Sequence, residues 1–184
     1  MTLQLSRLQK AALILTFIEK LKENGSWGGE THVQKAMYFL QHMTDFPMGF
    51  TFILYKHGPF SFDFRDELAG LFADGLLENK IIAFPYGPSL NPTAAGQRIR
   101  DYFFDSIQIY QNKLDFVANY LGNKGVVELE RMGTALYVTL EKEALDQETR
   151  FNRIIELKPH IKLDEAREAV QQVDDMRTCF EQNF

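Results

Sequence analysis

The sequence predicts a mainly α-helical fold with a small β-hairpin, an α+β class in which helices dominate. Apolar residues recur at helical spacing along most of the 184-residue chain. Short runs rich in aromatic and branched residues, bounded by Gly and Pro, interrupt the helical pattern in the first half only. The second half has no such run, so we expect it to be helical throughout.

The first half begins with two helices. A first helix is predicted over about residues 6–24, ended by Gly25, because four apolar residues lie at positions i, i+3, i+4 and i+7. These residues are Ile14, Phe17, Ile18 and Leu21. The second helix is predicted to begin at a capping box formed by Thr31 and Gln34, and to end before Pro47.

Strand and turn signals follow. Residues 50–55 are predicted to form a strand that ends in a tight turn at Gly58-Pro59, after which Ser61 caps a third helix that stops at Gly75. Leu76 and Leu77, followed by residues 81–84, suggest a strand. With a turn at 85–88 and a return strand at 89–92 it predicts a hairpin, and Thr93 can cap the next helix. This order of elements is the winged-helix pattern.

The second half is predicted to contain four helices, at residues 97–121, 126–143, 145–157 and 163–182. No long linker divides the chain. We therefore expect a winged-helix-like region over residues 1–104 and a helical extension over residues 105–184 that packs on it as one compact domain.

Composition and charge exclude several classes of function. The formal net charge is −5, so the chain as a whole does not attract phosphate backbones or anionic lipid, and nucleic acid is not the expected partner. No apolar run approaches the roughly 18 residues that would span a bilayer. Cys179 is the only cysteine and cannot form an intramolecular disulfide, which fits a cytoplasmic protein.

Residue patterns that support catalysis are missing from the sequence. The four histidines lack the i, i+4 spacing of a helical zinc motif, no phosphate-binding loop is complete, and Cys179 has acidic neighbours. We therefore expect no catalytic residue, no metal and no cofactor. One turn site stands out, formed by Tyr55, Lys56 and His57 between a strand and a Gly-Pro turn; the alternative is that His57 only orders the loop.

The third helix carries four carboxylates at helical spacing, namely Asp63, Asp66, Glu67 and Asp74. A helix that reads DNA normally presents basic or amide side chains, and these carboxylates would be repelled by phosphates. The apolar hairpin beside it would add Phe84 and Tyr86 as anchors. The sequence thus favours a protein partner with basic character. The alternative is that the hairpin packs on the C-terminal helices and the acidic face only contacts water.

These segments resemble the Panacea domain, a bacterial family. Lys35-Ala-Met-Tyr-Phe-Leu-Gln41 is similar to its Lys-x-x-Tyr-Phe-x-Gln helix, and Tyr55-Lys-His-Gly-Pro-Phe-Ser61 is similar to its Tyr-Gly-Pro turn. Gly75-Leu-Leu and Leu90-Asn-Pro-Thr-Ala-Ala-Gly96 are similar to its closing strand and Leu-Thr-x-x-Gly segment. The resemblance covers about residues 8–105, and the chain departs from it at Lys56-His57 and at Pro92.

Panacea-like proteins include antitoxins that bind a toxin protein, so the resemblance implies an interaction module without catalysis. Beyond Phe104 the chain is similar instead to uncharacterised stand-alone bacterial proteins, through LERMGTALY at 129–137 and LKPHIKLDEAREA at 157–169. The expected function is therefore protein binding, of an antitoxin-like or adaptor kind.

Two other functions remain open. One is a winged-helix regulator that binds DNA as a homodimer, with Arg98, Arg100 and Lys113 as its basic contacts. The other is a small ligand sensor or enzyme built around Tyr55, Lys56 and His57, which a deep pocket with convergent polar groups would favour.

Overall fold

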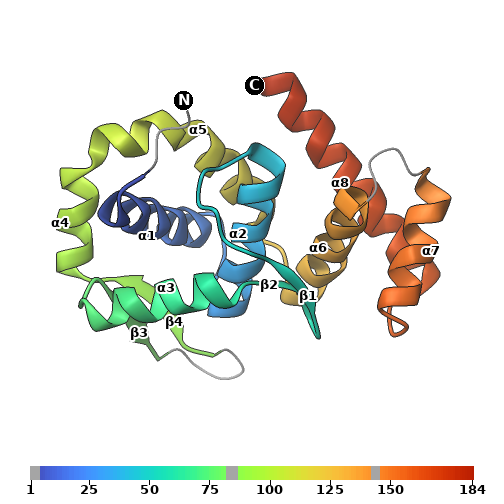
Figure 1. Ribbon diagram of the computed structural model, residues 1–184, viewed down its shortest axis with the longest axis horizontal. Helices are drawn as coiled ribbons and strands as arrows, with labels where there is room; N and C mark the ends of the chain where they lie inside the picture. Colours follow the sequence, from blue (N-terminus) through green and yellow to red (C-terminus); the bar gives the residue numbers. More distant parts are fainter. Residues whose placement is uncertain (1–4, 82–86, 142–145) are drawn as a thin grey trace.

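The computed structural model describes residues 5–81, 87–141 and 146–184. The described part contains eight helices and two antiparallel two-stranded hairpins, which confirms the mainly α fold with a small β component (Figure 1). The element order of the predicted winged helix is present, with one strand more than expected.

Helix α1 (Arg7–Glu23) lies at the centre of the N-terminal half, among α2, α3, α4 and α5 (Figure 1). Residues 11–18 are all buried, because a helix covered on every side has no solvent face. Its N-terminus is a capping box: the Ser6 hydroxyl accepts from the Gln9 N–H, and the Gln9 side chain accepts from the Ser6 N–H.

Helix α2 (Glu30–Thr44) begins one residue earlier than the predicted capping box, which is therefore wrong. Gly29 is the N-cap and has no side-chain cap bond, while Thr31 lies inside the first turn. Gln34 turns inward instead: its amide donates to the Ser61 carbonyl and accepts from the Ser61 N–H. The predicted capping box does not form because the Gln34 side chain bonds to the backbone of Ser61 instead of to its own helix terminus.

The first hairpin consists of β1 (Ile53–Tyr55) and β2 (Gly58–Phe60), in register with Tyr55 opposite Gly58. Its turn is therefore Lys56-His57, and the predicted turn at Gly58-Pro59 is wrong. Gly58 takes a positive φ of 91°, which glycine adopts without strain, and a sheet of only two strands tolerates Pro59.

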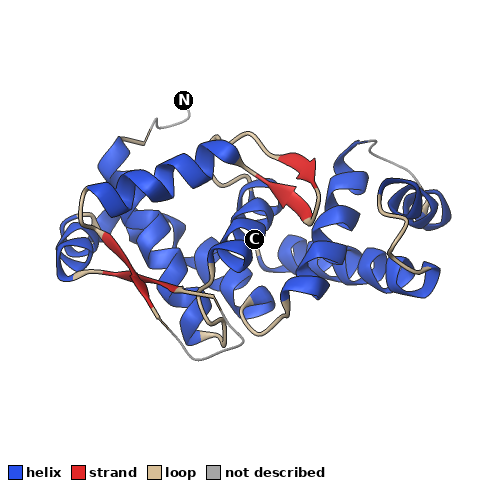
Figure 2. Ribbon diagram, turned by 90° about the horizontal axis from the view of Figure 1, so that it is seen from below, coloured by secondary structure: helices blue, strands red, loops and turns tan. Residues whose placement is uncertain are grey.

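The second hairpin pairs β3 (Leu77–Lys80) with β4 (Ser89–Pro92), well away from the first (Figure 2). The strand that pairs is the mostly polar 77–80 segment, which includes the predicted Leu77, and residues 82–84 of the predicted strand lie outside the described residues. The return strand at 89–92 is confirmed. Helix α3 (Phe62–Ala73) is capped by Ser61 as predicted, and Gly75 follows it with a φ of 67°.

The single helix predicted at 97–121 is wrong. The chain forms α4 (Ala94–Tyr102), capped by Thr93, and then α5 (Phe104–Leu121), with a break at Phe103. No Gly or Pro marks this break. Both helices pack on α1, which requires the chain to change direction between them, as Figure 1 shows.

The remaining predicted helices are confirmed as α6 (Val126–Glu141), α7 (Gln147–Leu157) and α8 (Leu163–Asn183). Helix α6 packs against α2 and β2 on one side and against α7 and α8 on the other. One continuous core therefore contains buried residues from both halves of the chain. No described helix has the length and apolar character that crossing a membrane requires.

Candidate functional site

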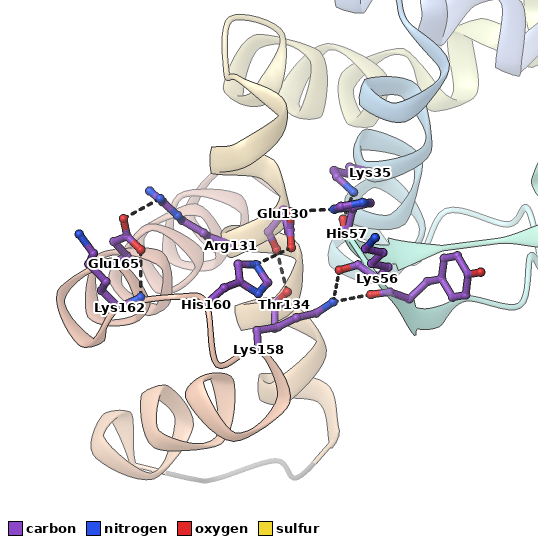
Figure 3. A network of polar contacts seen from close by, with 11 residues as sticks. Lys35, Lys56, His57, Glu130, Arg131, Thr134, Lys158, His160, Lys162 and Glu165 are labelled. Atoms are coloured by element: carbon purple, nitrogen blue, oxygen red, sulfur yellow. Dashed lines mark hydrogen bonds and ion pairs between the residues drawn. The ribbon is translucent and has the colours of Figure 1, made fainter.

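The Lys56-His57 turn is held from two sides by buried lysines. Lys35, from α2, donates a hydrogen bond to the His57 carbonyl. Lys158, at the end of α7, donates to the Tyr55 carbonyl and, over 2.6 Å, to the Lys56 carbonyl. Segments far apart in sequence therefore meet at this turn (Figure 3).

A buried carboxylate lies beside the turn. Glu130, on the first turns of α6, accepts from Nε2 of His160 over 3.1 Å, and its other oxygen lies 3.8 Å from Nδ1 of His57. Glu130 is nine-tenths buried, whereas both imidazoles are mostly exposed. Figure 3 shows the two rings on either side of this carboxylate, with Lys35 and Lys158 close by.

The positive charges of Lys35 and Lys158 interact electrostatically with the negative charge of Glu130. Burial, the largest cause, lowers the pKa of Lys35 to about 8; Glu130 opposes this shift and Lys158 adds to it. Burial also lowers the pKa of Lys158, again against the effect of Glu130. Both lysines donate hydrogen bonds to neutral carbonyl oxygens. Glu130 is the carboxylate whose negative charge stabilises the charged form of both.

Two cavities adjoin the turn, and His57 lines both. The Lys35 cavity has a volume of about 200 Å³ and lies between α2 and the first hairpin, lined by Glu30, Thr31, Gln34, Lys35, Tyr55, His57, Gly58 and Phe60. The His160 cavity, of about 400 Å³, lies between the turn and the C-terminal helices. Its walls are Lys56, His57, Val127, Glu130, Arg131, His160, Ile161 and Glu165.

An aromatic platform extends from the turn to the start of α3; we define it as Tyr55, Phe60 and Phe62. The Phe60 and Phe62 ring centroids are 5.1 Å apart, and Tyr55 lies about 6 Å from each. The guanidinium of Arg65 stands 5.2 Å from the Phe62 centroid. Tyr55 is 55% exposed and Phe62 43% exposed, so the platform faces solvent.

The four carboxylates of α3 do not act as one free acidic face. Asp63 accepts from the Thr51 N–H over 3.0 Å, and Asp74 forms an ion pair with Arg7. One oxygen of Glu67 is buried without a hydrogen bond. Asp66 is exposed and has no ion-pair partner within the described part of the chain. Asp63 and Asp66 are next to Phe62 and Arg65 in the sequence.

The predicted apolar anchors Phe84 and Tyr86 lie outside the described residues. The neighbouring Ile81 is 90% exposed. Of the three basic residues predicted as DNA contacts, one is exposed and two are bonded to other parts of the fold. Arg98 is exposed, whereas Arg100 pairs with Glu19 and bonds to Thr16, and Lys113 donates to the Thr44 carbonyl.

His32, on α2, lies in the core. Its ring is fully buried, hydrogen-bonded to Ser26 and to the Leu121 carbonyl, and burial lowers its pKa. In the parts of the chain that the structure describes, no three His, Cys, Asp or Glu side chains form a group that could hold a metal ion.

Sequence reasoning found half of the turn site. It selected Tyr55, Lys56 and His57 but not Glu130, Lys158 and His160. The missing residues lie at 129–137 and 157–169, the two C-terminal segments for which the sequence predicts a resemblance to other bacterial proteins. A charged Glu130 between the buried Leu129 and Met132 was the signal that could have identified it.

No protein-family model matches this chain, and no curated protein matches it. The resemblance to the Panacea domain therefore stays a prediction, and the function is argued from the residues themselves.

Proposed function

We propose that the protein is a non-catalytic protein-interaction module, of an antitoxin-like or adaptor kind, and that a partner protein binds on the aromatic platform. The contiguous rings of Tyr55, Phe60 and Phe62 are the observation that carries this proposal; Tyr55 and Phe62 are exposed, and the Arg65 guanidinium lies over the Phe62 ring. Aromatic residues and arginine are the side chains that most often dominate binding energy at protein interfaces.

The surroundings of the platform support the same function. Exposed carboxylates at Asp63 and Asp66 supply a charged rim for a partner with basic residues. Tyr55 and Phe60 also form one wall of the Lys35 cavity, whose volume of about 200 Å³ can receive a side chain of the partner. The lone cysteine fits a cytoplasmic setting for this interaction.

Affinity purification from the native host, with mass spectrometry, identifies the partner, and purified components then give a dissociation constant. We expect the double variant Tyr55→Ala, Phe62→Ala to weaken binding at least about thirtyfold, since hot-spot residues contribute about 2 kcal/mol or more. Asp66→Lys should weaken binding of a basic partner by a smaller factor.

Tyr102 and Phe104 provide the matched control. They are 81% and 58% exposed and lie on α4 and α5, away from the platform. The variant Tyr102→Ala, Phe104→Ala removes the same kind of surface and should leave the dissociation constant unchanged. Equal losses in both double variants, or a loss only in the control, would show that the platform is not the binding site.

A further inference from the structure

Lys35 brings a nucleophilic group to the wall of a cavity. The residue is only 3% exposed, and it lines the Lys35 cavity between α2 and the first hairpin. Tyr55 and Phe60 give the same cavity aromatic walls. The volume of about 200 Å³ corresponds to about seven water molecules at their share of the liquid, so the cavity admits only a small molecule.

The amine of Lys35 has few bonded partners for a buried group. A lysine ammonium has three N–H donors, but within the described residues Nζ of Lys35 makes a single hydrogen bond, to the His57 carbonyl, and no ion pair. Burial lowers its pKa to about 8, so an appreciable fraction of the side chain is the neutral amine near neutral pH. A desolvated, neutral lysine amine is the group that proteins use to attack carbonyl compounds.

We propose that Lys35 is a covalent binding site for a small aldehyde, which enters the Lys35 cavity and forms a Schiff base with Nζ. The aromatic rings of Tyr55 and Phe60 suit the hydrocarbon part of such a ligand. This goes beyond the proposed protein partner, because the reaction needs only the chain itself and a small molecule.

The reaction balances without an oxidant or a reductant. The lone pair of the neutral amine forms a bond to the carbonyl carbon, and one electron pair of the C=O bond moves to the oxygen. The nitrogen then loses a proton and the oxygen gains one, which gives a carbinolamine. The hydroxyl group and the last nitrogen proton leave as water, and a C=N bond remains. One aldehyde is bound and one water is released.

The charges around Lys35 favour this adduct. A Schiff base that takes up a proton is an iminium ion, with the same positive charge as the ammonium and with one N–H. The negative charge of Glu130 stabilises a positive charge on Nζ, and the one N–H suffices for the bond to the His57 carbonyl. Carbon dioxide would instead give an anionic carbamate, which Glu30 in the cavity wall and Glu130 would repel.

The test is reductive trapping of the full chain with butanal and cyanoborohydride, in which peptide mass spectrometry locates each alkylated lysine and follows its rate. At pH 7 an amine of pKa about 8 is neutral on the order of a hundred times more often than one with the ordinary value of about 10.4. Entry into the cavity takes back part of this advantage. We expect Lys35 to react at least about tenfold faster than the exposed Lys80 on β3.

Lys158 is the matched control in the same sample. It is also a buried lysine that donates to backbone carbonyls, and burial lowers its pKa, but it does not line the Lys35 cavity. Lys158 should therefore react more slowly than Lys35. A bulky aldehyde, pyrenecarboxaldehyde, should label Lys80 and leave Lys35 unlabelled, because it exceeds the cavity.

The variant Lys35→Arg keeps the positive charge and an N–H donor but removes the nucleophile. It should lose the fast phase of butanal incorporation, while the other lysines react as before. Lys35 reacting no faster than Lys80 or Lys158, or reacting equally well with the bulky aldehyde, would overturn the inference. The chain is tested without a partner, so failure of the platform variants to lose partner binding would leave this result unchanged.

Discussion

Lys35 is a buried lysine. The free energy required to bury its charge should be visible in the pH dependence of the free energy of unfolding. The pKa of this lysine is lowered from 10.5 to about 8 by burial in the folded protein. Between these values the unfolded chain still holds the proton and the folded chain has released it. The contribution of Lys35 to stability therefore rises with pH over this window and is constant below it.

Lys35→Met removes this contribution. We expect the free energy of unfolding of the wild type, relative to Lys35→Met, to increase by about 2 kcal/mol from pH 8 to pH 10. Urea unfolding of both proteins at the two pH values measures this difference. A difference that stays constant, or that falls as the pH rises, would show that Lys35 is not shifted in this way.

Glu130 is the carboxylate on which the charge balance of the turn site depends. Glu130→Gln leaves the charges of Lys35 and Lys158 without their neighbour, in a place where water does not screen them well. We expect a loss of about 3 kcal/mol in the free energy of unfolding, as for removal of one member of a buried charged group.

Glu128→Gln is the control on the same helix. Glu128 pairs with Lys124 at i, i+4 and is partly exposed, so its loss should cost less than about 1 kcal/mol. Equal effects of the two changes in urea unfolding would mean that burial of Glu130 has no energetic consequence.

At the scale of elements, the close approach of α6 to β2 fixes the turn site. Gly133 allows this approach, because a Cβ at this position would stand 2.8 Å from Cδ of Pro59. The rigid proline ring cannot move away easily. The hairpin that presents His57 is therefore seated directly against the helix that presents Glu130.

Two helical glycines should respond to alanine with opposite signs. Gly133→Ala should lower the free energy of unfolding by about 1 to 3 kcal/mol through overpacking. Gly70→Ala on α3 should raise it by up to about 1 kcal/mol, because alanine favours the helix. A Cβ at Gly70 would meet only the Arg7 guanidinium, at 3.5 Å, which is an ordinary van der Waals contact. Thermal unfolding of both variants decides whether contact or helix propensity dominates at each site.

At the scale of the whole molecule, the two predicted regions share one core. The inner face of α5, which includes Leu114, Val117 and Leu121, is fully buried and packs on α1 and α2. Helix α6 covers α2 and β2 in the same way. Removing these helices would expose the buried apolar residues of α1 and α2 that they cover.

A chain that ends at residue 104 should therefore not fold by itself. We expect weak dispersion in its NMR spectrum and no cooperative thermal transition, because it loses the covering for α1 and α2. A chain that ends at residue 178 loses only exposed and half-buried residues and should unfold cooperatively. A folded 1–104 fragment would show instead that the winged-helix region is an independent domain.

Local patterns were enough to predict most elements. Ser61 and Thr93 cap their helices as the sequence predicts, since each hydroxyl bonds to an N–H only three residues away. The predicted helices of the second half are found where apolar periodicity places them, apart from the break at Phe103. The break has no local signal because packing of both α4 and α5 on α1 causes it.

The sequence by itself determined the fold class, the helix caps at Ser61 and Thr93, and the candidate turn site at Tyr55, Lys56 and His57, because these depend on contacts between near neighbours. Only the tertiary structure decided what surrounds that turn. Glu130 lies 73 positions from His57 and Lys158 lies 102 from Lys56, and no local pattern reports such distances. Packing between distant segments places His57 between two cavities and next to the buried charges of Glu130 and Lys35.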